Sequence, residues 1–338
     1  MRVASRLMAM LVLLPALAQA GVLDRLVLNK DKQLQMEREA AAARARINAV
    51  AWPLLTHPNL LAQCEGGRPA YGFRHRGTEG YELERKQDQD LEAMGWVPRQ
   101  VLEVYPGSPA EAAGLQVGDV IVGFDGRRIR KNSYKGDNRI TELLAEAREE
   151  GRAIELEVER SGARQVLRIE PVRVCDFEAI LGGTAGIAGA HDLPRKLRAR
   201  AIMVDIGLYR LVAEDEALLQ AVIVHELAHQ FLDHYKVRGM AGTAARVTGT
   251  AMEYAGMGGT PGLLLKLGTR VAFKAGEERE ADLKALELMR SLDLNPEVYV
   301  AFVHRLAEAR PDLVASGVGA HPVNEERLAA LRAGGGQG

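Results

Sequence analysis

Residues 221–232 read AVIVHELAHQFL, a His-Glu-x-x-His pattern inside an apolar run. Side chains four residues apart on a helix share one face, so His225 and His229 can point at one ion. Two neutral imidazoles at this spacing suit Zn²⁺. Glu226 lies beside the first histidine, where it can hold an attacking water and take its proton. We therefore predict one zinc ion per chain; the alternative is a buried amphipathic helix that carries two histidines by chance.

A third ligand is expected downstream, because a catalytic zinc site has three protein ligands and an open position for water. The extended histidine pattern of metzincins is absent after residue 229. Residues 277–286 (EEREADLKAL) instead predict a second helix, with Glu278 and Asp282 one turn apart on one face. Glu278 is the predicted third ligand, and Asp282 would accept the other ring proton of His225. The alternative is an acidic stripe that faces water.

Three motifs together resemble a known family. Residues 225–229 (HELAH), residues 278–282 (EREAD), and His321-Pro322 with Arg327 resemble the zinc peptidases of the CAAX prenyl protease and HtpX type, most closely the soluble periplasmic members. The resemblance spans about residues 175–335. It implies a gluzincin-type metalloendopeptidase and an α+β fold with a mainly helical zincin-type domain. It also implies polypeptide substrates and a role in quality control of envelope proteins.

Two details of the resemblance stay open. His321 would approach the cleft and hydrogen-bond the substrate or the transition-state oxyanion; the alternative is a structural bond at the start of a helix. Such peptidases usually carry an Asn-Ala pair ahead of the strand before the metal helix, and residues 183–189 (GTAGIAG) contain no Asn. The strand predicted over 201–206 would align the substrate as an added strand.

Residues 66–173 predict a separate, small β-rich domain. Its GSPAxxAGL stretch at 107–115, followed by GDxI at 118–121, resembles PDZ domains of the bacterial protease type. The resemblance implies a peptide groove between a strand and a helix over 139–150. The terminal carboxylate of a target would be held by backbone N–H groups of Tyr71-Gly72-Phe73. The alternative is a small β domain that only packs on the peptidase.

The N-terminus has the pattern of a secretory signal peptide over 1–20. Two arginines precede a short apolar run, and an Ala-x-Ala site ends at Ala20. The alternative, a transmembrane anchor, needs about twenty apolar residues, and no Cys follows the cleavage site as a lipoprotein would require. We therefore predict an exported, periplasmic protein. A disulfide between Cys64 and Cys175, the two cysteines of the chain, fits that compartment; two buried thiols are the alternative.

The remaining segments give weaker indications. Residues 21–65 predict a helical segment, with a helix over 24–51 that Pro53 ends. The peptidase domain is predicted over 174–333 and a disordered tail over 334–338. Residues 238–273, rich in Gly and Ala, predict either a helical lid near the cleft or a loop that makes peripheral membrane contact. A formal net charge of -1 over 338 residues gives no reason to expect nucleic acid, and no pattern specifies an oligomeric state.

Three functions compete at this point. The leading hypothesis is a zinc endopeptidase with a PDZ-like domain for substrate capture. The second is a PDZ-type adaptor or holdase with a latent or structural zinc site. A zinc hydrolase that acts on a non-peptide substrate is the third, and the PDZ-like domain favours polypeptides over it.

Overall fold

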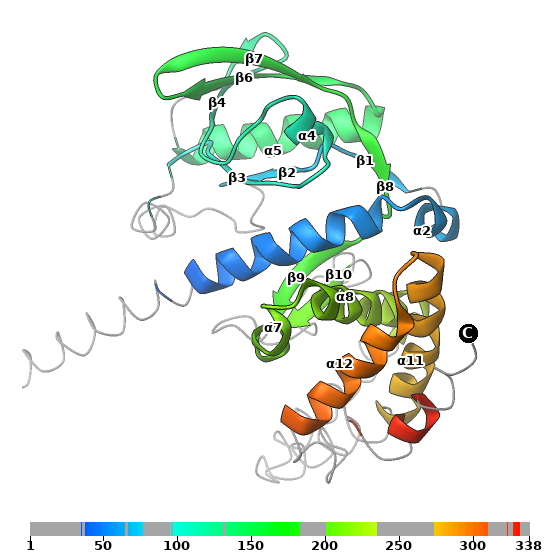
Figure 1. Cartoon of the computed structure of the whole chain (residues 1–338). Helices are drawn as coiled ribbons and strands as arrows, with labels where there is room; N and C mark the ends of the chain where they lie inside the picture. Colours follow the sequence, from blue (N-terminus) through cyan, green and yellow to red (C-terminus); the bar gives the residue numbers. More distant parts are fainter. Residues whose placement is uncertain are drawn as a thin grey trace, which may run out of the picture.

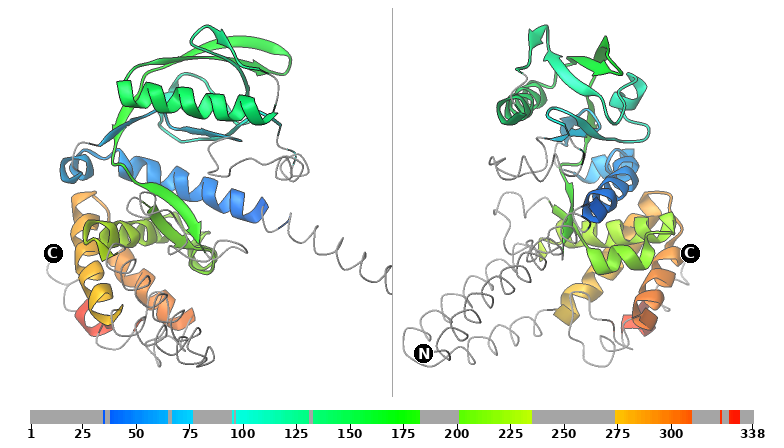
Figure 2. Two further views of the ribbon diagram at one scale, coloured as in Figure 1. Left: turned by 180° about the vertical axis from the view of Figure 1, so that it is seen from behind. Right: turned by 90° about the vertical axis from the view of Figure 1, so that its left-hand side faces the viewer.

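The chain forms a β-rich region (residues 68–174) and a helical region (residues 201–309), shown as a computed structural model in Figure 1. An N-terminal helix lies between them, as the two further views in Figure 2 also show. The structure describes residues 35, 38–64, 67–76, 95, 97–130, 133–182, 201–234, 274–309, 323 and 327–331. The predicted signal peptide, the 238–273 segment and the tail lie outside these residues. Among the described helices, none is long and apolar enough to cross a membrane.

The β-rich region is built around a four-stranded antiparallel sheet with the order β5-β4-β6-β7. Its strands are β4 (Val120–Phe124), β5 (Arg127–Arg128), β6 (Ile154–Arg160) and β7 (Ala163–Ile169). The sequence predicts a hairpin of strands over 153–159 and 164–170 around Ser161-Gly162, and the structure confirms it. Both turn residues have positive φ, as a tight two-residue turn requires. Helix α5 (Ser133–Glu150) begins six residues before its predicted start at 139.

The sequence pattern of residues 69–74 predicts a single short strand, and this prediction is wrong because the chain turns at Gly72. Strand β1 (Arg68–Ala70) ends before it and β2 (Phe73–His75) begins after it. Gly72 has a φ of +82°, which favours glycine. β1 pairs with β8 (Val172–Val174), and β2 pairs with β3 (Val101–Val104), both antiparallel. The short helix α4 (Pro109–Ala112) follows β3 and is capped by Ser108, whose Oγ accepts from the Glu111 N–H.

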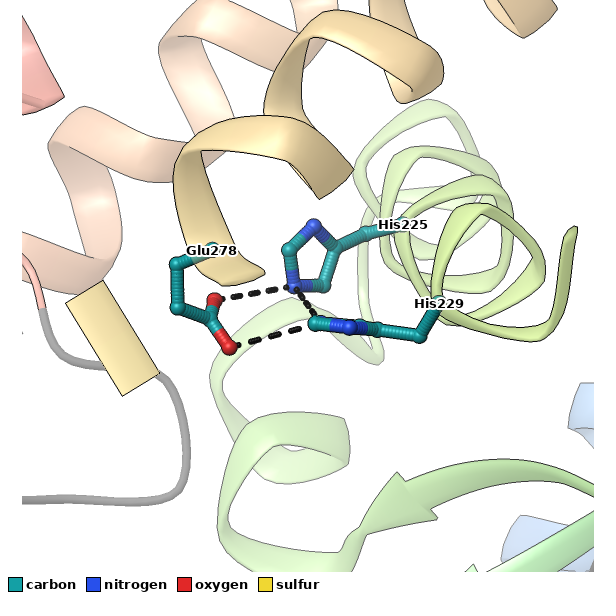
Figure 3. Close-up of side chains that lie close together, drawn as sticks. All are labelled: His225, His229 and Glu278. Carbon is teal, nitrogen blue, oxygen red and sulfur yellow. Dashed lines mark hydrogen bonds and ion pairs between the residues drawn. The ribbon is translucent and has the colours of Figure 1, made fainter. Parts of the chain in front are cut away.

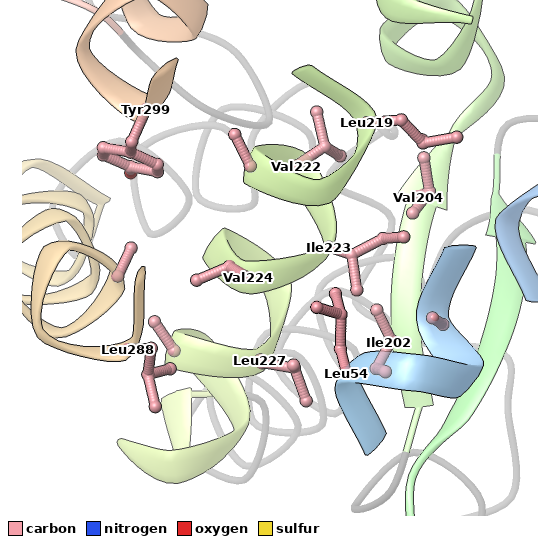
Figure 4. Close-up of a cluster of buried hydrophobic side chains, with 14 of the residues drawn as sticks. Leu54, Ile202, Val204, Leu219, Val222, Ile223, Val224, Leu227, Leu288 and Tyr299 are labelled. Atoms are coloured by element: carbon pink, nitrogen blue, oxygen red, sulfur yellow. The ribbon is translucent and has the colours of Figure 1, made fainter. Parts of the chain in front are cut away.

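The helical region is organised around α8 (Glu216–Phe231), the helix predicted from the opening motif. Asp215 caps its N-terminus by accepting from the Leu218 N–H. α8 packs against α11 (Lys274–Ser291), α12 (Pro296–Ala309) and strand β10 (Ala201–Asp205). β10 pairs in parallel with β9 (Glu178–Gly182) and leads into α7 (Ile206–Val212). Every residue from 221 to 230 is buried, so α8 is the centre of the core (Figure 4).

The N-terminal helix over 38–55 belongs to the core of the helical region. Its buried residues include Ile47 and Leu54, and Leu54 lies beside Ile202 and Leu227 in Figure 4. The prediction that Pro53 ends this helix is wrong, because the helix continues to residue 55. The two leucines that follow Pro53 are buried in the core. The free energy of their burial offsets the cost of the backbone hydrogen bond that the proline cannot donate.

Two contacts fasten the β-rich region to this N-terminal helix. The Asn48 side chain donates to Glu103 Oε2 on β3 at 3.1 Å, and both residues are buried. The rings of Trp52 and Tyr105 lie 5.4 Å apart. The predicted disulfide between Cys64 and Cys175 is also present and joins the two ends of the β-rich region. The apolar cores of the two regions nevertheless form separate clusters.

Candidate metal centre

Three side chains from two helices converge beside the centre of the core. His225 and His229 lie one turn apart on α8, and Glu278 faces them from the first turns of α11 (Figure 3). The Glu278 oxygens lie 3.3 Å from His225 Nε2 and 3.3 Å from His229 Nε2. The two Nε2 atoms are 3.1 Å apart. The sequence predicted this meeting across about fifty residues of chain.

The donor set suits a divalent cation of the zinc type. One ligand atom from each of His225, His229 and Glu278 can be chosen so that all lie within 4.8 Å of one another, and all three residues are buried. Two imidazole nitrogens and one carboxylate form the three-ligand set of many catalytic zinc sites. Each Glu278 oxygen faces one of the two imidazole Nε2 atoms, and a cation between these atoms would stabilise the buried carboxylate further, beside the contact that its Oε2 makes with Arg327. The residues present therefore fit the metal that the sequence predicts.

Glu226 and Asp282 lie next to this group. Glu226 is fully buried on α8, directly after His225. The prediction that Asp282 accepts the His225 ring proton is wrong, because Asp282 Oδ1 is 3.8 Å from His225 Nδ1. The Tyr299 hydroxyl lies between them, 2.8 Å from His225 Nδ1, and donates to Asp282 Oδ1 at 2.5 Å. No sequence motif pointed to Tyr299, because only the packing of α12 brings it to the site.

Arg327 fixes both carboxylates of α11. Its guanidinium donates to the two oxygens of Asp282 at 2.6 and 2.7 Å, and its Nη1 is 3.2 Å from Glu278 Oε2. Burial lowers the pKa of Arg327, but the charges of Glu278 and Asp282 outweigh it and raise the pKa above its usual value. Arg327 therefore stays charged and compensates the two acidic residues in the interior.

His229 has a partner that the sequence analysis missed. Its Nδ1 is 2.9 Å from Nδ1 of His234, whose Nε2 is 3.4 Å from Glu280. The α8 helix ends at Phe231, and Asp233 has a φ of 57°, which turns the chain back toward the helix. His234 lies five residues after His229, a spacing that predicts a position away from the metal face of the helix. It reaches the second nitrogen of His229 because it lies beyond the helix end.

The other predicted site residues fall in different places. His321 lies outside the described residues. Tyr71 and Gly72 form the turn between β1 and β2, and Phe73 begins β2. The hydrogen bonds of two carbonyls show how the peptide planes of this turn are oriented. The Tyr71 carbonyl accepts from the Ala110 N–H at 3.0 Å, and the Gly72 carbonyl accepts from the Tyr105 N–H at 2.9 Å.

These two bonds orient the peptide planes of the turn. In a trans peptide the N–H points opposite to the carbonyl, and the structure contains no cis peptide bond among its described residues. The N–H groups of Gly72 and Phe73 therefore both point away from the segment that holds Tyr105 and Ala110. Consecutive N–H groups on one side of a turn are the arrangement that binds an anion such as a carboxylate.

Comparison with known proteins identifies both regions. Residues 193–334 match the family model of peptidase family M48, and residues 100–160 match that of a PDZ domain. The chain is a peptidase family M48 protein that carries a PDZ domain. The M48 match contains His225, His229 and Glu278, so the buried group lies inside the peptidase domain. Peptidases of this family are metal-dependent. The PDZ match contains the GSPA stretch and ends with β6.

Two solved structures resemble the PDZ part of this M48 protein. One is the PDZ domain of HtrA3 bound to a phage-derived ligand, with 26% identity, covering 31% of this chain and 86% of that chain. The other is the HtrA-type protease AlgW with a decapeptide, with 21% identity, covering 32% of this chain and 30% of that chain. Both have a TM-score of 0.22, so the PDZ assignment rests on the family model instead.

Proposed function

We propose that this M48 protein is a zinc-dependent endopeptidase of the gluzincin type that acts on exported polypeptides. The observation that carries the proposal is the convergence of His225, His229 and Glu278 in one buried group. Each residue lies on a helix that the core holds in place, so the group is built before any ligand arrives.

Each residue of the site is proposed to have its own role in hydrolysis. When bound by His225, His229 and Glu278, Zn²⁺ would act as a Lewis acid on the scissile carbonyl and on water. Glu226 takes the proton of the attacking water on its carboxylate and hands it to the leaving amine. Its full burial on α8 strengthens this role, because charges interact more strongly where bulk water is excluded. His321 is proposed to donate to the oxyanion.

The substrate would bind as an extended strand beside β10. Of the strands that the structure describes, only β9 pairs with β10. The buried side chains Ile202 and Val204 pack one face of β10 against α8, and the edge of β10 away from β9 has no partner among the described strands. A polypeptide that adds to this edge would gain main-chain hydrogen bonds close to the zinc ligands.

The PDZ domain would capture the substrate before cleavage. The Gly72 and Phe73 N–H groups, which share one direction, are the proposed anchor for a terminal carboxylate. Held there, a target would be present at high effective concentration for the peptidase domain. We place this activity in the periplasm, where the Cys64–Cys175 disulfide persists and misfolded envelope proteins are the substrate class that the family resemblance suggests.

The test is replacement of Glu226 by Gln. We expect Glu226→Gln to retain one zinc per chain and to lose about 100- to 10,000-fold of its cleavage rate, the range of general acid–base catalysis. The measurements are zinc content by mass spectrometry and cleavage of a labelled unfolded protein, with and without a chelator.

Glu216→Gln is the matched control, because Glu216 is exposed at the start of the same helix and pairs with Arg46. It should cleave at the wild-type rate. Cleavage by Glu226→Gln at that same rate would refute the base assignment. A wild-type protein that binds zinc and peptides but cleaves nothing would favour the adaptor or holdase instead.

A further inference from the structure

Tyr299 lies in the metal centre without touching the zinc-ligand nitrogens. It is fully buried and comes from the first turn of α12, which no motif connects to α8. Its hydroxyl bridges His225 Nδ1 and Asp282 Oδ1. The bridge matters because each imidazole ligand must present an unprotonated nitrogen to the metal, and the bond at its other nitrogen decides which one that is.

The direction of the bridge follows from its two ends. Both oxygens of Asp282 accept from Arg327, and an ionised carboxylate offers Tyr299 only acceptor positions. A tyrosine phenol is an O–H donor at neutral pH, so Tyr299 has one proton to give. The single hydroxyl proton is therefore directed at Asp282, which leaves the phenol oxygen to accept from His225.

We propose that Tyr299 is a positioning residue that sets the His225 tautomer: its oxygen accepts from His225 Nδ1–H while its proton goes to Asp282. The unprotonated Nε2 of His225 then faces Glu278 and His229. The inference rests on the proposed zinc site and adds to it the residue that orients one ligand. Asp282 cannot replace Tyr299 from its present place, since 3.8 Å is too long for a hydrogen bond.

Burial makes the role of Tyr299 hard to replace. Tyr299 is 0% exposed and Asp282 is 3% exposed. Removal of the phenol oxygen leaves a gap between imidazole and carboxylate inside a packed core, where a buried donor without an acceptor is costly. The two ligand histidines differ in this respect, because His229 has its second contact from His234 near its own helix.

The first test is Tyr299→Phe, with Tyr209→Phe as the matched control. Tyr209 is a partly buried tyrosine on α7 that packs against the same core. We expect Tyr299→Phe to weaken zinc affinity 10- to 100-fold in a competition assay with a chromophoric chelator. The visible spectrum of the Co²⁺-loaded protein should change as well, while Tyr209→Phe matches the wild type in both measurements.

The second test needs no variant and so remains decisive if Tyr299→Phe does not fold. Nitrogen-15 NMR of histidines in the zinc-loaded wild-type protein should show His225 protonated at Nδ1 and not at Nε2. The opposite tautomer, or wild-type zinc affinity and Co²⁺ spectrum in a folded Tyr299→Phe, would overturn the assignment while leaving the proposed peptidase intact. Failure of the wild-type protein to bind zinc at all would overturn both.

Discussion

The PDZ domain and the M48 domain both bury histidines, but the side chains that act on these imidazole rings differ. In the M48 domain, His225 and His229 face the carboxylates of Glu278 and Asp282, which Arg327 balances. In the PDZ domain, His75 is fully buried on β2. Burial, followed by the charges of Arg148 and Arg74, lowers the pKa of His75 from 6.5 to about 3.

The difference separates a site built for a cation from one that resists positive charge. A site rich in buried carboxylates gains from a divalent metal, whereas burial together with Arg148 and Arg74 disfavours a proton on the His75 ring. The two domains also have separate apolar cores, so each should tolerate damage to the other. Three predictions test how far this separation holds.

The largest effect is expected at the joint between the domains. Replacement of both Cys64 and Cys175 by Ser removes a link that closes 111 residues of chain, so the free energy of unfolding should fall by about 2–5 kcal/mol. Because Cys175 packs in the M48 core, the loss should fall mainly on the unfolding of that domain. The measurement is urea unfolding under non-reducing conditions.

Reduced wild-type protein is the control for the double serine variant and should unfold at the same urea concentration. If the double variant were as stable as the oxidised wild type, the link would contribute nothing and the cores alone would hold the joint.

The second prediction concerns the turn that is the proposed carboxylate anchor. A Cβ on Gly72 would lie 2.2 Å from Ser108 Cβ, and its φ is +82°. Gly72→Ala should therefore destabilise the PDZ domain by about 2–3 kcal/mol through overpacking and backbone strain. Peptide binding should weaken, while zinc affinity stays unchanged because the metal lies in the other core.

Gly107→Ala is the matched control, since Gly107 has a φ of +71° but no atom within 4 Å of a Cβ at that position. The difference between the two variants isolates the steric part. A matching loss of zinc affinity in Gly72→Ala would show that the domains are coupled through the N-terminal helix.

The smallest effect is a pH dependence of PDZ stability. His75 has a lower pKa in the folded state than in the unfolded state, so the unfolded chain binds the extra proton between about pH 3 and pH 6.5. The contribution of His75 to the free energy of unfolding is thus full above pH 6.5 and is lost as the pH is lowered through this window. At pH 5.5 the loss should be about 1.4 kcal/mol, one pKa unit below the unfolded value.

Urea unfolding at pH 7.5 and 5.5 measures this loss, and His75→Gln is the comparison because it has no titrating ring. The variant should lose less stability than the wild type over the same interval. Equal slopes would mean that other groups account for the acid sensitivity.

The sequence identified the elements that carry strong local signals. The apolar run with His225 and His229 specified α8, and residues 277–286 predicted the helix that forms α11. It failed where tertiary packing overrides a local rule. Pro53 does not end the N-terminal helix because the following leucines are buried, and the strand around Gly72 is broken by a turn that fits against Ser108.

By itself, the sequence determined which residues could hold a metal and which could move a proton, because chemistry depends on residue type and helical spacing keeps His225 and His229 on one face. Only the tertiary structure decided that Glu278 reaches them, and that Tyr299 rather than Asp282 contacts His225. Those contacts join helices far apart in the chain, and the packing of side chains between α8, α11 and α12 sets their distances.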